Sequence, residues 1–278
     1  MQHPKLLMKI GDGDEFNIAD KVPGLEYLGD DSTVTTTTQL SQVAGVDGAI
    51  YQYKTFNNYQ VPAKFFLRFG NWQSFKLAKH EIQKIFSTKK IIRIRTDTET
   101  AIVRFVLAND PEIHPAEDLA HYSLFTVNFD NPSGYRYSIF RSDTMYDFAK
   151  SGWQIGMNIP VGEKLNYHFT DKIFKVYNAS DVPVDPYYGN ADLKIICKFS
   201  GDKLTLTNKT NGSTWTYNKA STGSDSIILD GINTTLNGKA ASVNTDYGNL
   251  SLETGWNDVE ATGANSVDIT FSFPFIYR

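Results

Sequence analysis

The strongest constraint on the fold is an alternation of apolar and polar residues with a period of two, which recurs along most of the chain. Every second residue is apolar from Ala63 to Phe69, and again from Val267 to Phe273. This period is typical of half-buried β-strands, because successive side chains point to opposite faces of a sheet. We therefore expect a mainly β protein.

One segment breaks this period. Between Trp72 and Thr88 the apolar residues recur at steps of three and four, while the charged residues lie mostly off that stripe. Such spacing places apolar side chains along one face of a helix. The sequence thus predicts a single amphipathic helix among antiparallel strands, as in an α+β barrel or open sheet.

Turn-forming residues divide the chain near its middle. The run from Asn131 to Gly134 is the strongest such signal, so we expect an N-terminal domain at 1–140 and a C-terminal domain at 141–278. The second domain has short alternating segments and hairpin turns at Asn211-Gly212 and Asn237-Gly238, which favours a β-sandwich.

The start of the chain is less regular. It contains several turn signals and one β-branched segment, from Thr33 to Thr38. We expect an extended arm with one or two strands before Val46, because this segment has too little apolar content to fold alone.

Composition excludes several classes of protein. The formal net charge of -4 and the pI near 5.7 give no general attraction for nucleic acid. Cys197 cannot form an intrachain disulfide, since it is the only cysteine, and its alternation with apolar neighbours predicts a core position. We find neither a transmembrane segment nor a secretory leader, so we expect synthesis in a cytoplasm.

The chain offers no motif for an enzyme, a cofactor or a metal. The run from Asp12 to Glu15 lacks EF-hand spacing and is expected to be a solvated turn, and His114 and His121 stand outside any HExxH motif. No nucleophile elbow or phosphate-binding loop occurs. A cell-wall hydrolase remains an alternative, because the two carboxylates of a glycosidase need not be close in sequence.

A second alternative is a carbohydrate-binding module. Trp215 and Trp256 could form a platform for a sugar ring, since aromatic faces stack on sugars and sandwiches often carry such sites. Core or interface packing is the favoured role for both side chains.

The end of the chain resembles a known family. Residues Gly255 to Val259 and Val267 to Arg278 are similar to the ending of siphophage and prophage distal tail proteins of Gram-positive hosts, the Dit-like siphovirus tail component family. The Gly45-Val46-Asp47-Gly48 turn and the helix from Trp72 also resemble features of the family's first domain.

This resemblance implies a fold and a function. It implies an N-terminal split β-barrel with one α-helix, followed by a galectin-like β-sandwich. It also implies a homo-hexameric ring in the virion, a structural adaptor hub and no enzyme. The ring would join the major tail tube protein to a tail-associated lysin, spike or fibre protein, and could carry baseplate receptor-binding proteins. The binding of host cell-wall saccharides is the alternative function.

A closed ring needs heterologous contacts, in which one surface of a subunit meets a different surface of the next. The expected oligomer interface comprises Val46, Asp47, Gly48, Ile50 and Tyr51. The segment from Asp47 to Tyr53 could add a strand or a loop to a neighbour.

Overall fold

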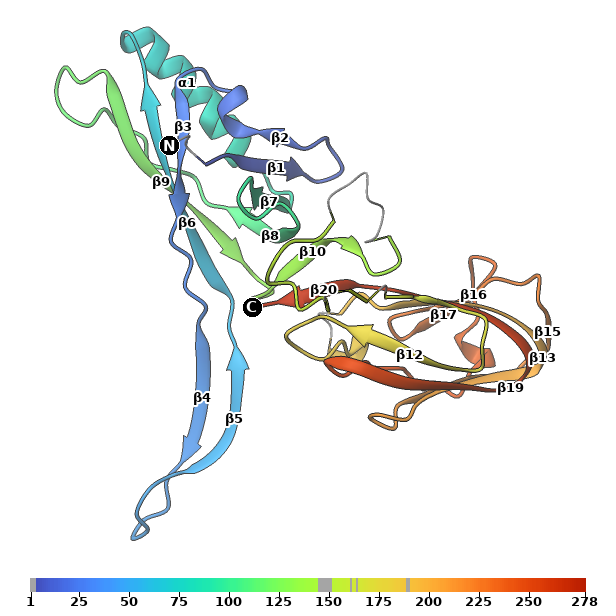
Figure 1. Cartoon of the computed structure of the whole chain (residues 1–278). Helices are drawn as coiled ribbons and strands as arrows, with labels where there is room; N and C mark the ends of the chain where they lie inside the picture. Colours follow the sequence, from blue (N-terminus) through green and yellow to red (C-terminus); the bar gives the residue numbers. More distant parts are fainter. Residues whose placement is uncertain (1–3, 145–151, 161, 164, 189–190) are drawn as a thin grey trace. The chain divides into compact units, whose positions relative to one another are not determined.

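Figure 1 shows the chain as a computed structural model, which describes residues 4–144, 152–160, 162–163, 165–188 and 191–278. The chain divides into two compact units, one of residues 1–136 with Arg278 and one of residues 137–277. We call them the N-terminal unit and the C-terminal unit. The predicted mainly β fold is confirmed, and α1 is the only α-helix among the described residues.

The N-terminal unit is built on an antiparallel sheet. Its elements are β1 (Leu6–Ile10), β2 (Phe16–Asn17), the 3-10 helix η1 (Ile18–Asp20), β3 (Leu25–Asp30), β4 (Thr36–Ser41), β5 (Ile50–Phe56), β6 (Tyr59–Arg68), α1 (Trp72–Phe86), β7 (Ile92–Thr96), β8 (Ile102–Ala108) and β9 (Tyr122–Asn131). Seven strands lie in the order β2-β1-β7-β8-β9-β6-β3 (Figure 1).

This sheet is split between β8 and β9. These two strands are joined through two residue pairs, Leu107 with Asp130 and Ala108 with Phe129, whereas β6 pairs with β9 over ten residues. Buried residues from both halves of the sheet and from α1 belong to one apolar cluster, so the halves enclose a shared core. The arrangement agrees with the split barrel implied by the sequence resemblance.

Helix α1 closes this core, and its start is well defined. Asn71 and Ser74 form a reciprocal capping box: the Asn71 side chain accepts from the Ser74 N–H (2.8 Å), and Ser74 Oγ accepts from the Asn71 N–H (3.0 Å). Phe75, Ile82 and Phe86 are buried in the core. The predicted helix is confirmed, although it ends at Phe86 rather than at Thr88.

The prediction that the residues before Val46 form an arm with too little apolar content is wrong for β1 to β3, although β4 does lie in an exposed arm. β1 pairs with β7, and Leu6, Met8 and Tyr27 are buried in the N-terminal core. These apolar residues lie in short strands of 5, 2 and 6 residues separated by turns, so the sequence pattern alone does not indicate a core element. The strand expected at Thr33–Thr38 is β4, which lies slightly further along the chain.

The C-terminal unit consists of strands and short turns of 3-10 helix. The remaining elements are β10 (Arg136–Arg141), β11 (His168–Phe169), β12 (Ile173–Asn178), η3 (Pro186–Tyr188), β13 (Lys194–Asn208), β14 (Thr214–Tyr217), β15 (Ser221–Thr222), β16 (Ile227–Asp230), β17 (Asn233–Leu236), β18 (Lys239–Ala240), η4 (Ser242–Asn244), β19 (Gly255–Ser272) and β20 (Pro274–Tyr277).

Two long strands, β13 and β19, organise this unit (Figure 1). Their pairing shifts register near Gly201, and each half of the pair has its own neighbours: β16 and β11 on one side of the shift, β14 and β12 on the other. Gly263 lies at this irregularity with φ +82°, and a Cβ there would come within 2.8 Å of the Lys203 side chain. The two long strands therefore join both groups of shorter strands into one sheet.

The Asn-Gly turns lie where the sequence placed them. Asn237 and Gly238 connect β17 to β18, and their φ angles of +49° and +80° are those of a type I′ hairpin turn. Asn211-Gly212 connects β13 to β14, with Gly212 at φ +77°.

The turn between β1 and β2 is held by an ion-pair cluster. The Glu15 carboxylate accepts hydrogen bonds from Arg93 Nη2 (2.8 Å) and from Arg95 Nε (3.0 Å), both on β7. The hydrogen bond from Arg95 holds the pKa of Glu15 below its usual value, against the opposing effect of burial. Glu15 is thus paired, while the neighbouring Asp12 and Asp14 remain at the surface.

We predict that Glu15→Gln lowers the free energy of unfolding by about 1 kcal/mol at pH 7, because the charge-assisted hydrogen bonds are lost. The folded pKa lies below the unfolded pKa of about 4.5, so this stabilisation is complete above that value and is lost as the pH falls through the folded pKa. The stabilities of the two proteins, measured by urea titration, should converge in that acidic range. Glu112→Gln, at an exposed site, is the control. An equal difference at all pH values would contradict the prediction.

Candidate functional site

The N-terminal unit carries a β-hairpin that is separate from its sheet. Among the described strands, β4 and β5 pair with each other alone, in antiparallel register. The hairpin projects away from the rest of the unit (Figure 1). We call residues 36–56 the hairpin arm and residues 42–51 its tip.

The outer half of the hairpin arm exposes apolar side chains. Those with at least half of their surface exposed are Leu40, Val43, Val46, Ile50, Tyr51 and Tyr53. An isolated two-stranded hairpin is marginally stable in water, and clustered exposed apolar residues mark contact surfaces. The arm therefore has the properties of an element that is buried against another chain.

A β-bulge gives the arm two apolar faces. Gln39 pairs with Tyr53, but the next residue, Leu40, pairs with Tyr51, so Gln52 is the extra residue. Cross-strand partners share a face and successive residues alternate, so Tyr51 and Leu40 lie on one face and Tyr53 on the other. Without the bulge, both tyrosines would share one face.

The base of the arm is fixed to the N-terminal unit. The Asn57 N–H donates to the Thr35 carbonyl (3.0 Å), and the Arg278 guanidinium lies 3.5 Å from the centroid of the Phe56 ring. Gly134 lies against Asn57, with φ +72°, and a Cβ there would come 2.5 Å from the Asn57 carbonyl oxygen. The arm therefore has an anchored base and an exposed tip.

The structure brings the five interface residues predicted from the sequence together at this tip. Val46, Ile50 and Tyr51 are 65%, 61% and 62% exposed, and Asp47 and Gly48 lie in the turn between them. The sequence prediction missed Val43 at the tip, and Leu40 and Tyr53, which extend the apolar surface toward the base. The β-propensity of Tyr53 and its nearness to Tyr51 were available signals, but the bulge that separates their faces depends on the pairing with β4.

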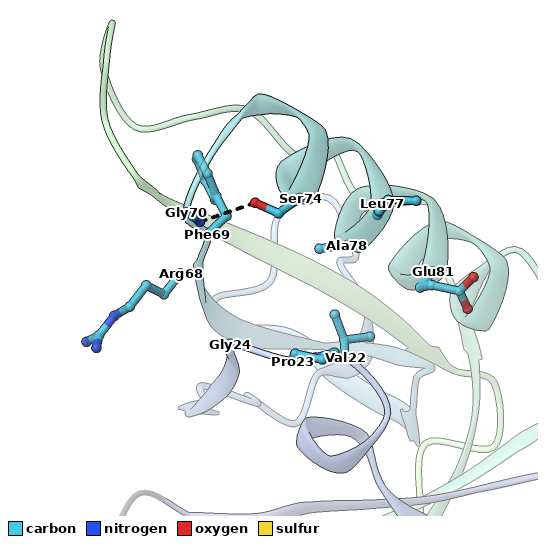
Figure 2. A pocket seen from close by; sticks show the side chains of 10 residues that line it. All are labelled: Val22, Pro23, Gly24, Arg68, Phe69, Gly70, Ser74, Leu77, Ala78 and Glu81. Atoms are coloured by element: carbon cyan, nitrogen blue, oxygen red, sulfur yellow. Dashed lines mark hydrogen bonds between the residues drawn. The ribbon is translucent and has the colours of Figure 1, made fainter.

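A groove lies at the other end of β6, beside α1 (Figure 2). It has a volume of about 570 Å³. Its apolar lining includes Val22, Pro23, Phe69, Leu77 and Ala78, and its charged residues are Arg68 and Glu81. We call this surface the α1 groove. Leu77 is 69% exposed, so the apolar lining reaches the surface of the unit.

The floor of the α1 groove is formed by two backbone segments, at Gly24 and Arg68, that lie in close contact. The Arg68 N–H donates to the Gly24 carbonyl (2.8 Å), and a Cβ at Gly24 would come 2.3 Å from the Arg68 carbonyl oxygen. Phe69 packs against Phe75 with 4.8 Å between ring centroids. These contacts give the groove a fixed shape.

The predicted sugar platform does not form. Trp215 is fully buried, and its Nε1 donates to Thr234 Oγ1 (3.3 Å). A buried ring cannot stack on a sugar, so Trp215 has the favoured core-packing role and not the alternative one. Trp256 is 45% exposed and packs edge-on against Tyr177, with 4.9 Å between ring centroids.

The described residues contain no group of three or more His, Cys, Asp or Glu side chains that could hold a metal ion. Cys197 is buried, as predicted, and burial raises the pKa of its thiol, which disfavours the nucleophilic thiolate. No helix in the described part of the chain is long and apolar enough to cross a membrane.

Part of the chain is similar to a known family of domains. Residues 11–131 match the model of the phage tail protein RIFT-related domain. The match extends from β2 to β9, including α1 and the hairpin arm. No curated protein sequence matches the chain.

Among solved structures, the chain is similar to the Dit protein of phage SPP1, described as a paradigm of the hub adsorption apparatus in phages that infect Gram-positive bacteria. The TM-score is 0.66 at 12% identity, over 97% of this chain and 99% of that chain. An activated baseplate structure of phage P2 matches at a TM-score of 0.48 and 11% identity, over 99% of this chain and 98% of that chain. The fold of this chain is that of the Dit hub protein, which confirms the resemblance seen in the sequence.

We predict that replacing residues 37–55 with Asn-Gly leaves the N-terminal unit folded, because the strand residues removed are all exposed or only partly buried. The free energy of unfolding should change by less than about 1 kcal/mol, which urea titration followed by circular dichroism would measure. A loss of several kcal/mol would show that the arm stabilises its own unit.

Proposed function

We propose that the chain is a structural hub at the distal end of a siphophage tail, where it forms a homo-hexameric ring. The observation that carries this proposal is the hairpin arm, which is anchored at its base and apolar on both faces. Burial of such an arm against a neighbour supplies the heterologous contact that a ring requires. The phage tail domain at residues 11–131 supports the same conclusion.

In this role the protein works through its contacts and needs no catalytic group. One face of the ring would meet the major tail tube protein, and the other would meet a tail-associated lysin, spike or fibre protein. The C-terminal unit could carry receptor-binding proteins. The protein would be made in the host cytoplasm and end in the virion. Its net charge of -4 favours solubility of the free subunits before assembly.

The ring assignment predicts a specific effect of mutations at the tip. Ile50→Ser and Tyr51→Ser should each reduce the fraction of protein in rings by about tenfold, because each removes an apolar side chain that the contact would bury. Mass photometry of the purified protein and electron-microscope images of tail tips would measure ring formation.

The matched control is Ile173→Ser in the C-terminal unit, where the isoleucine is 74% exposed. This variant should form rings as the unmodified protein does. If the subunits assemble only on the growing tail, the purified protein forms no rings, and electron-microscope images of tails then measure ring formation instead. Intact rings in the variant that lacks residues 37–55 would refute the proposed role of the arm.

A further inference from the structure

We propose that a pocket between the start of α1 and the loop from β8 to β9 binds a neutral saccharide, whose ring stacks on Trp72 and whose hydroxyls donate to Glu117 and Asp118. The pocket has a volume of about 530 Å³ and lies within the N-terminal unit. We call it the Trp72 pocket. The inference goes beyond the proposed hub, because it assigns a ligand and a site that ring formation does not require.

One side of the Trp72 pocket is an exposed indole ring. Trp72 is the first residue of α1, and it is 56% exposed. Phe69 also lines the pocket but is nearly buried, so it forms the inner part of the lining. Large aromatic rings gain free energy when they are removed from water, and an exposed ring in a pocket can therefore bind an apolar ligand surface. The C–H groups on one face of a sugar ring form such a surface.

The other side of the Trp72 pocket carries two carboxylates. The loop of residues 109–121 lies beside the start of α1 (Figure 1), and its Glu117 and Asp118 line the pocket. Both residues are exposed, and neither takes part in an ion pair within the described residues. A carboxylate accepts hydrogen bonds at both oxygens, so it can accept from neighbouring hydroxyls of one ligand.

Backbone hydrogen bonds hold this loop against β6 and in its own turn. The Phe69 N–H donates to the His121 carbonyl (2.9 Å), and the rings of the two residues lie 6.3 Å apart between centroids. The Ala120 N–H donates to the Glu117 carbonyl (3.1 Å), which closes a tight turn that contains Asp118. The pocket is therefore preformed, and a ligand would need to order little of it on binding.

The charges near the pocket favour a neutral ligand. Lys76 Nζ lies over the Trp72 ring, 5.6 Å from its centroid, so one face of the indole already holds a cation. This charge opposes a second cation at the ring, whereas the two carboxylates oppose an anion. No group of three or more His, Cys, Asp or Glu side chains within the described residues could hold a metal ion there. A neutral ligand with hydroxyl donors and an apolar face meets all these conditions.

Binding of neutral sugars to the full chain tests the inference. The probes are glucose, galactose and N-acetylglucosamine, and binding is measured by saturation-transfer NMR and titration calorimetry. At least one of them should bind with a Kd of about 1 mM or tighter, an affinity that a small ligand can reach in a preformed pocket. If none of the three sugars binds, the proposal is overturned.

Variants of the pocket locate the site. Trp72→Ala and Asp118→Ala should each weaken sugar binding by at least about tenfold, because the first removes the stacked ring and the second removes a charged acceptor. The matched controls are Trp153→Ala, where the ring is 54% exposed, and Asp202→Ala, both in the C-terminal unit. The controls should bind as the unmodified protein does. Circular dichroism verifies that each variant is folded.

These experiments separate the inference from the proposed function. Trp72→Ala should still form rings, because the pocket needs no second copy. Loss of rings in this variant would make Trp72 a contact between proteins, which would overturn the saccharide site and leave the hub standing. Sugar binding that is lost in Trp256→Ala but kept in Trp72→Ala would place the ligand on the C-terminal unit, and this too would overturn the inference.

Discussion

The contacts of Phe65 on β6 hold the N-terminal unit together. Its ring lies 5.4 Å from that of Phe125 on β9, 5.6 Å from Tyr27 on β3 and 6.0 Å from Phe86 on α1. Three strands and the helix thus meet at one fully buried side chain. Aromatic pairs at these distances add to the free energy of burial. Because β6 is fixed in the middle of this cluster, the segments at its two ends, the hairpin arm and the α1 groove, keep constant positions within the unit.

The elements that could be predicted from the sequence are those whose pattern is local. The helix is one, because its apolar stripe and the Asn71 cap lie within a single window. The turn at Asn237-Gly238 is another, because its residues favour positive φ without help from tertiary contacts. The residues predicted to form an interface, among them Val46 and Ile50, are exposed at the tip of the arm, and their role in a contact stays a prediction.

The predictions that failed depended on distant partners. β1 is a core strand because β7, more than eighty residues later in the chain, pairs with it and covers Leu6 and Met8. The alternative of a sugar platform at Trp215 was left open for the same reason, because its sequence neighbours do not distinguish an inner from an outer face, whereas the structure buries it. The two faces of the arm depend on the bulge at Gln52, which is a property of the pairing between β4 and β5.

The same strand geometry explains why an exposed apolar arm is tolerated. A flat apolar hairpin with free edges is prone to pair with any other strand, and a bulge lessens this by twisting the strands. Here the bulge also distributes Tyr51 and Tyr53 over two faces, so neither face alone presents both rings. A partner that buries both rings must contact both faces of the arm. Few unrelated proteins have a surface of that shape. Specificity for the intended neighbour therefore follows from one extra residue in β5, without any additional buried contact inside the N-terminal unit.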